Sequence, residues 1–143
     1  MAIDQISIFV ENSPGRLAEV TQTLGAAGID LRAMSIADTM DFGILRLIVS
    51  EPARALEVLK AAQCVVSVTP VLAVSVADKP GSLARALSVL AAEGISVEYA
   101  YAFIARQQGN AYVIFRVENN ERAQAVLIKN GIQVVQSDEL YTL

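Results

Sequence analysis

The sequence contains no histidine and only one cysteine, Cys64. Histidine supplies the usual general base near neutral pH, the commonest metal ligand and the partner of serine and cysteine nucleophiles. One cysteine cannot form an internal disulfide. Catalysis would therefore have to rest on Asp, Glu, Lys or Tyr, so we predict a protein that is not an enzyme and that has no metal and no cofactor.

Positive charge is also scarce, with 11 Lys and Arg against 15 Asp and Glu and a net charge of −4. Phosphate binding needs clustered basic residues, so nucleic acid is not an expected partner. No apolar run approaches the roughly 18 residues of a membrane helix, and residues 1–5 lack the basic region of a signal peptide. We therefore expect no membrane association and a cytoplasmic location.

What the chain does contain is an internal repeat. Residues 6–10 match residues 72–76, and residues 14–18 match residues 80–84, both at an offset of 66 positions. Residues 43–49 match residues 111–117 at an offset of 68, and a hairpin tip between Ile36 and Gly43 can absorb this change. Matches this dense predict a duplication, with one domain at residues 1–69 and a second at residues 70–143.

Within each copy the hydrophobic period alternates between that of a strand and that of a helix. The first copy is expected to form a strand at 6–10, a helix ended by Gly28, strands at 31–36 and 43–49 around a tip at 38–41, a helix capped by Ser50 and a strand at 64–68. The second is expected to form a strand at 72–76, a helix ended by Gly94, strands at 97–104 and 111–117 around a tip at 107–110, a helix capped by Asn120 and a strand at 132–135. The order βαββαβ, twice, predicts an α+β fold of two tandem ferredoxin-like units.

The central strands of both copies are apolar on both faces, apart from Arg46 and Arg116. Two helices cover only one face of a four-stranded sheet, so the other face needs a cover. We expect the sister unit, another chain or both to supply it. The connection at 69–71 is too short for a free linker, which predicts a fixed arrangement of the units.

A short motif lies between the first strand and the first helix of both copies. It consists of Asn12, Ser13, Pro14, Gly15, Arg16 and Leu17 in one copy and of Asp78, Lys79, Pro80, Gly81, Ser82 and Leu83 in the other. Proline suits a helix start, glycine lets a ligand approach the backbone, and a helix N-terminus offers N–H donors to a carboxylate. The motif therefore indicates an amino-acid site. The alternative is a plain helix-starting turn, which a repeat would also duplicate.

The order βαββαβ with Asx-x-Pro-Gly-x-Leu after strand one, and with Gly-Ile-Asp-Leu or Gly-Ile-Ser-Val entering strand two, resembles the ACT domain over almost the whole chain. This resemblance implies an allosteric, amino-acid-binding regulatory protein, with domains paired side by side and the ligand between a loop and a neighbouring domain's second strand. It also implies a homodimer and a metabolic enzyme as a further partner. The strand residues that it implies as ligand contacts are Asp30, Met34, Ser35, Ser96, Tyr99 and Tyr101.

Three alternatives stay open. Val97, Tyr99, Tyr101 and Phe103 alternate and should share one strand face, either as core or interface or as a pocket wall. The chain could also be an interaction module that docks on a metabolic enzyme without a small ligand. A small ferredoxin-like enzyme, such as an acyl-phosphate phosphatase, ranks lowest because only Arg16 supplies a loop arginine.

Overall fold

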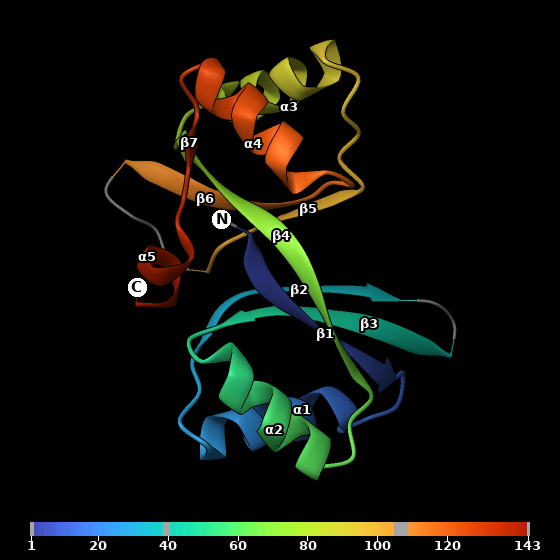
Figure 1. Ribbon diagram of the computed structural model, residues 1–143. Coiled ribbons are helices and arrows are strands. Elements are labelled where there is room, and N and C mark those ends of the chain that lie inside the picture. Colours follow the sequence, from blue (N-terminus) through green and yellow to red (C-terminus); the bar gives the residue numbers. More distant parts are fainter. Residues whose placement is uncertain (1, 39–40, 105–108, 143) are drawn as a thin grey trace. The chain divides into compact units, whose positions relative to one another are not determined.

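The computed structural model describes residues 2–38, 41–104 and 109–142, so parts of both expected hairpin tips, residues 39–40 and 107–108, lie outside it. The chain forms two compact units: Asp4–Thr69 makes up most of the first and Pro70–Leu140 most of the second. In each unit, two helices lie on one face of an antiparallel sheet (Figure 1). This arrangement confirms the predicted ferredoxin-like α+β fold.

The first unit has the predicted element order. It contains β1 (Ile3–Glu11), α1 (Arg16–Ala26), β2 (Leu31–Asp38), β3 (Phe42–Val49), α2 (Pro52–Ala61) and the beginning of β4 (Val66–Ala77). Strand β3 lies between β1 and β2 and is antiparallel to both. On the other side of β1, the Phe9 N–H donates to the Val65 carbonyl at 3.0 Å, at the approach to β4.

The second unit repeats this order. It contains the rest of β4, α3 (Ser82–Ala92), β5 (Tyr99–Ala102), β6 (Asn110–Arg116), α4 (Asn120–Lys129), β7 (Gln133–Val134) and α5 (Ser137–Tyr141). Strand β6 lies between β4 and β5, and β7 pairs with β4. The short helix α5 has no counterpart in the described residues of the first unit and was not predicted.

Each unit has its own hydrophobic core between its helices and its sheet. The first core includes Ile6, Ile8, Val20, Leu24, Leu45, Leu47, Ala55 and Leu59, and the second includes Leu72, Val74, Ala86, Leu90, Val113, Phe115, Ala123 and Leu127. The strand residues among them alternate along their strands, as the sequence predicts, whereas Leu17 and Leu83 at the helix starts are exposed. Each large side chain buried in this way contributes about 1.5–3 kcal/mol relative to an exposed position.

The helix ends follow the predictions only in part. Gly28 ends α1 with φ +72°, and the Ile29 N–H donates to the Leu24 carbonyl at 3.0 Å, as in a Schellman motif. Ser50 does not cap α2, because its Oγ instead accepts the N–H of Asp30 at 3.0 Å. The N-cap of α2 is Glu51, which makes no side-chain cap bond.

The cap of α4 also differs from the prediction, by one residue. Asn119, and not Asn120, is the N-cap, since its Oδ1 accepts the N–H of Arg122 at 3.1 Å. An asparagine oxygen satisfies one of the otherwise unpaired N–H groups of the first turn from this position. Because Asn119 and Asn120 are adjacent and both suit an N-cap, the sequence does not show which of them caps the helix.

Strand β4 runs without interruption through the expected connection at 69–71. Pro70 lies inside this strand without breaking it. A proline φ near −65° is compatible with extended backbone, and only the N–H of proline is missing. The expected separate strands at 64–68 and 72–76 are therefore two halves of one strand. The assignment of residues 1–69 and 70–143 as separate domains remains a prediction.

Strand β5 is shorter than the expected strand at 97–104. Val97 precedes it and packs against the core of the second unit. Tyr99 and Tyr101 lie opposite Arg116 and Ile114, on the sheet face away from the helices. The prediction that Val97 shares one sheet face with Tyr99, Tyr101 and Phe103 is therefore wrong for Val97, which packs on the helix side.

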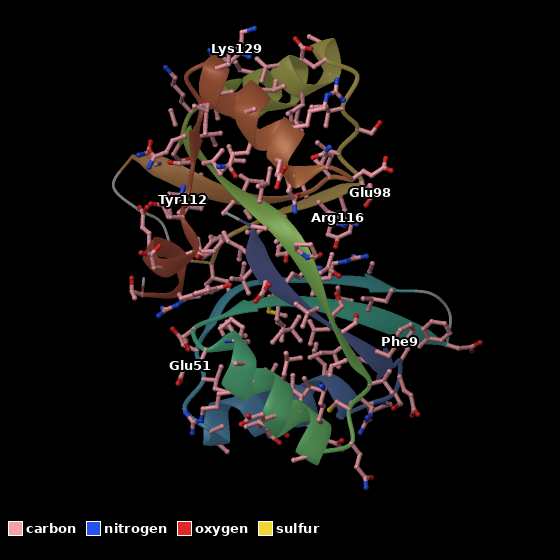
Figure 2. All side chains as sticks on the ribbon, viewed as in Figure 1. Phe9, Glu51, Glu98, Tyr112, Arg116 and Lys129 are labelled. Carbon is pink, nitrogen blue, oxygen red and sulfur yellow. The ribbon has the colours of Figure 1, made fainter. Side chains whose placement is uncertain are left out.

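The sheet face away from the helices is unevenly buried in the first unit. Ala33 and Ile48 are fully buried, whereas Phe9 and Phe42 are 52% and 43% exposed. The two phenyl rings pack against each other with centroids 5.6 Å apart, and Figure 2 labels Phe9 near the start of β3. What covers this face stays a prediction.

Candidate functional site

The two predicted loops have the same backbone geometry. Both place a glycine in the left-handed region at the helix N-cap, Gly15 with φ +88° and Gly81 with φ +89°. Equivalent turn bonds precede each helix: Ser13 N–H to the Glu11 carbonyl at 2.9 Å and Lys79 N–H to the Ala77 carbonyl at 2.8 Å, then Arg16 N–H to Ser13 and Ser82 N–H to Lys79, both at 3.3 Å. The duplication therefore extends to the conformation of the motif.

The roles of proline and glycine differ from the sequence interpretation. Pro14 and Pro80 lie before their helices, which begin at Arg16 and Ser82, and not in the first helical turn. A Cβ built on Gly15 or Gly81 would meet no atom within 4 Å, so space does not require glycine there. The positive φ does, because L side chains are disfavoured in that region.

Each loop leaves backbone N–H groups unpaired at the start of its helix. The first helical bonds are Glu19 N–H to the Gly15 carbonyl at 2.9 Å and Arg85 N–H to the Gly81 carbonyl at 3.0 Å. Within the part of the chain that the structure describes, the N–H groups of Leu17, Ala18, Leu83 and Ala84 have no hydrogen-bond partner. Free donors at the positive end of a helix suit a carboxylate.

A pocket of about 120 Å³ lies beside the first loop. Its wall is mostly apolar and its rim polar; the lining residues are Val10, Glu11, Asn12, Ser13, Leu17, Ile36, Gly43 and Leu45. Three of the predicted loop residues, Asn12, Ser13 and Leu17, thus meet at one cavity. Ile36 was not predicted, although its two-residue spacing from Met34 places both on the helix-facing side of β2.

The predicted residues of β2 lie apart from the loop of their own unit. Strands β1 and β2 are both antiparallel to β3, so they are parallel to each other, and the loop after β1 lies near the end of β2. Asp30 precedes β2 at the opposite end of the sheet, where its carboxylate contacts Arg32 at 2.9 Å. Met34 packs against the core, and Ser35 lies on the other face. One unit alone does not bring them to the first loop.

The second unit separates its predicted residues in the same way. Ser96 lines a pocket of about 160 Å³ with Glu98, Glu118 and Arg122, between the ends of α3 and β6. The rings of Tyr99 and Tyr101 stack with centroids 6.4 Å apart. Arg116, labelled with Glu98 in Figure 2, contacts that carboxylate at 3.4 Å. Arg116 therefore has an acidic partner within its own unit.

The hydroxyl of Tyr112 donates to Oε1 of Glu139, on α5, at 3.3 Å. Burial raises the pKa of Tyr112, and the charge and the hydrogen bond of Glu139 raise it further. Burial also raises the pKa of Tyr141. The neutral phenol is the form that the folded state favours in both cases.

The stability of the fold is therefore expected to fall as the pH rises through the tyrosine range. A folded-state pKa above the unfolded value gives stability that is complete below the unfolded pKa, about 10, and that is lost as the pH passes the folded value. Absorbance at 295 nm should show Tyr112 ionising late, and Glu139→Gln should make it ionise earlier. Glu98→Gln is the control. If Glu139→Gln leaves the titration unchanged, the Tyr112–Glu139 contact has no such effect.

Two negative findings concern residues 2–38, 41–104 and 109–142. In these segments no three His, Cys, Asp or Glu side chains form a group that could hold a metal ion. No helix in the same segments is long and apolar enough to cross a membrane.

Comparison with known proteins identifies the family. The family model for the ACT domain pair matches residues 1–143. The crystal structure of protein BT0572 from Bacteroides thetaiotaomicron is similar at 40% identity and a TM-score of 0.93, over 100% of this chain and 98% of that one. No curated protein matches the sequence.

The fold is also that of a known regulatory subunit. The ligand-free structure of the regulatory subunit of aspartate kinase from Thermus thermophilus has 22% identity and a TM-score of 0.66, over 88% of this chain and 91% of that one. The corresponding subunit from Thermus flavus has 21% identity and a TM-score of 0.61, over 88% and 90%. At these identities the likeness concerns the fold alone. From the match along its whole length, the chain belongs to the ACT domain family, as an ACT domain pair.

Proposed function

We propose that this protein is a non-catalytic regulatory protein that binds a free amino acid at its ACT domains. The observation that carries the proposal is the duplicated loop, in which each copy holds a glycine N-cap and leaves two N–H groups unpaired in the same geometry. Every helix start leaves such donors, and here a pocket beside the first loop adds room for a ligand next to them.

The first loop also offers room for a side chain. The ligand carboxylate would accept from the N–H groups of Leu17 and Ala18, and its side chain would enter the pocket of about 120 Å³. Because Val10, Leu17, Ile36 and Leu45 form the wall, an aliphatic side chain suits it better than a charged one. The rim residues Glu11 and Asn12 supply oxygen atoms for the ammonium group.

A second chain would complete the site. Asp30 and the first loop lie at opposite ends of the same sheet, so a ligand that contacts both kinds of residue requires a neighbouring domain's second strand. We therefore propose a homodimer in which the ligand favours one arrangement of the subunits. The size of that effect is limited by the difference in ligand affinity between the arrangements.

The regulated partner would be a metabolic enzyme on which this protein docks as a separate regulatory subunit. Support comes from the aspartate kinase regulatory subunits, which share the fold. If no amino acid binds, docking without a ligand is the second candidate. The exposed Phe9, Phe42 and Val65 of the first unit favour it, since aromatic and aliphatic side chains on one face suit a protein partner.

A thermal-shift screen of the twenty amino acids, followed by calorimetry, tests the proposed function. A ligand present at 100 times its Kd should stabilise the fold by about 2.7 kcal/mol. We expect at least one aliphatic amino acid to raise the Tm in a concentration-dependent way. No response to any amino acid at millimolar concentration would contradict the proposal, and capture of a stoichiometric enzyme by the unliganded protein would then favour the docking module.

A further inference from the structure

The second unit has a pocket of about 270 Å³ where β4 ends, next to the start of α3 and the turn before β7. Its lining residues are Ser75, Val76, Ala77, Lys79, Ser82, Arg85, Gly131 and Ile132. It differs from the apolar pocket of the first unit both in position and in chemistry. The hydroxyl of Ser82 and two cationic side chains provide hydrogen-bond donors around the cavity.

The pocket is positively charged in an acidic protein. Among the described residues, its lining includes Lys79 and Arg85 but no acidic residue, although the whole chain has a net charge of −4. Nη2 of Arg85 donates to the backbone carbonyl of Asn130 at 2.7 Å, which holds the guanidinium at the end of α4. Over the described ranges, neither cation has a carboxylate partner.

The equivalent positions of the first unit do not carry this excess of positive charge. The repeat places Ser13, Arg16 and Glu19 at the positions of Lys79, Ser82 and Arg85. There, Nη1 of Arg16 contacts Oε2 of Glu19 at 2.6 Å, so the two charges neutralise each other. The scaffold therefore does not require two unneutralised cations, and their presence in one copy calls for another reason.

We infer that the second unit binds a small anion in this pocket, namely the carboxylate or phosphate group of a metabolite. Lys79 and Arg85 supply the charge, and Ser82 supplies a further donor. Guanidinium and ammonium groups form their strongest hydrogen bonds with such oxyanions. This site shares Lys79 and Ser82 with the second predicted loop, but it goes beyond the proposed function because it needs no ammonium acceptor and does not use the pocket of the first unit.

An NMR titration of the 15N-labelled full chain with inorganic phosphate, and separately with succinate, tests the inference. Ionic strength is held constant with sodium chloride. We expect saturable shifts of the Ser82, Arg85 and Gly131 amides with at least one of the two anions, and the tighter one identifies phosphate or carboxylate chemistry. Lys79→Gln and Arg85→Gln should each weaken binding about fivefold, and the double variant about twentyfold.

The matched control is Lys129→Gln, which removes one positive charge from the same unit outside the pocket; Figure 2 labels Lys129 on α4. It should change the affinity less than twofold. The inference is overturned if neither anion gives saturable shifts, if chloride alone gives the same shifts, or if the double variant binds as well as the parent. Saturable anion shifts together with a blank amino-acid screen would remove the proposed function and leave this inference standing, because phosphate and succinate carry no ammonium group.

Discussion

Ala18→Pro is expected to weaken amino-acid binding by at least about tenfold, since a hydrogen bond to a charged group is worth about 1.5–3 kcal/mol. The substitution removes one N–H donor from the first turn of α1. Proline is tolerated in a first helical turn, because the N–H that it lacks has no helical partner there. The Ala18 side chain is exposed, so the core is not disturbed. Calorimetry with the amino acid that responds best in the screen measures the loss.

Ala18→Val is the matched control, because it adds a side chain of comparable size and keeps the N–H. Its affinity should stay within about threefold of the parent, a change of less than one hydrogen bond. Ala84→Pro makes the same change at the equivalent exposed position of the second loop and reports whether that loop binds too. Equal affinity in Ala18→Pro, Ala18→Val and the parent would show that the first-turn amides do not hold the ligand.

Leu127→Ala is expected to lower the free energy of unfolding by about 2–5 kcal/mol, the range for a buried leucine that leaves a cavity. Leu127 lies on α4, is fully buried and belongs to the core of the second unit. Close packing prevents its neighbours from filling the space completely. Urea denaturation followed by circular dichroism measures the change in the midpoint.

Ile128→Ala provides the control on the next residue of the same helix. Ile128 is 55% exposed, so its truncation should cost less than about 1 kcal/mol. Any effect on helix propensity is favourable, because alanine exceeds isoleucine. Equal destabilisation by the two substitutions would contradict the assignment of Leu127, and not Ile128, to the core.

The repeat made the fold predictable from the sequence. Two copies with the same switch between strand and helix periods determined the order of the elements, and the Gly28 and Gly94 stops followed from the left-handed backbone that glycine tolerates. Strand β4 was divided wrongly because Pro70 reads as a break, whereas an extended strand accepts it where no N–H is needed. Helix α5 was missed because it has only five residues and no copy in the first unit.

The candidate site was predictable only where local backbone chemistry determines it. The positive φ of Gly15 and Gly81 requires glycine, so the sequence marks these turns directly. Ile36 and Arg85 were missed because their part in a pocket depends on which elements lie beside them, and no local spacing encodes that. Ser50 was misjudged for a similar reason, since its bond to Asp30 joins residues twenty positions apart.

The most direct test is to record 15N NMR spectra while the best-responding amino acid is added to the full chain. If the duplicated helix starts receive the ligand carboxylate, the Leu17 and Ala18 amide signals should move downfield, with saturation at the calorimetric Kd. The Leu83 and Ala84 signals should follow if the second loop also binds. Saturable binding that leaves all four amides unmoved, with the shifts elsewhere, would contradict the account.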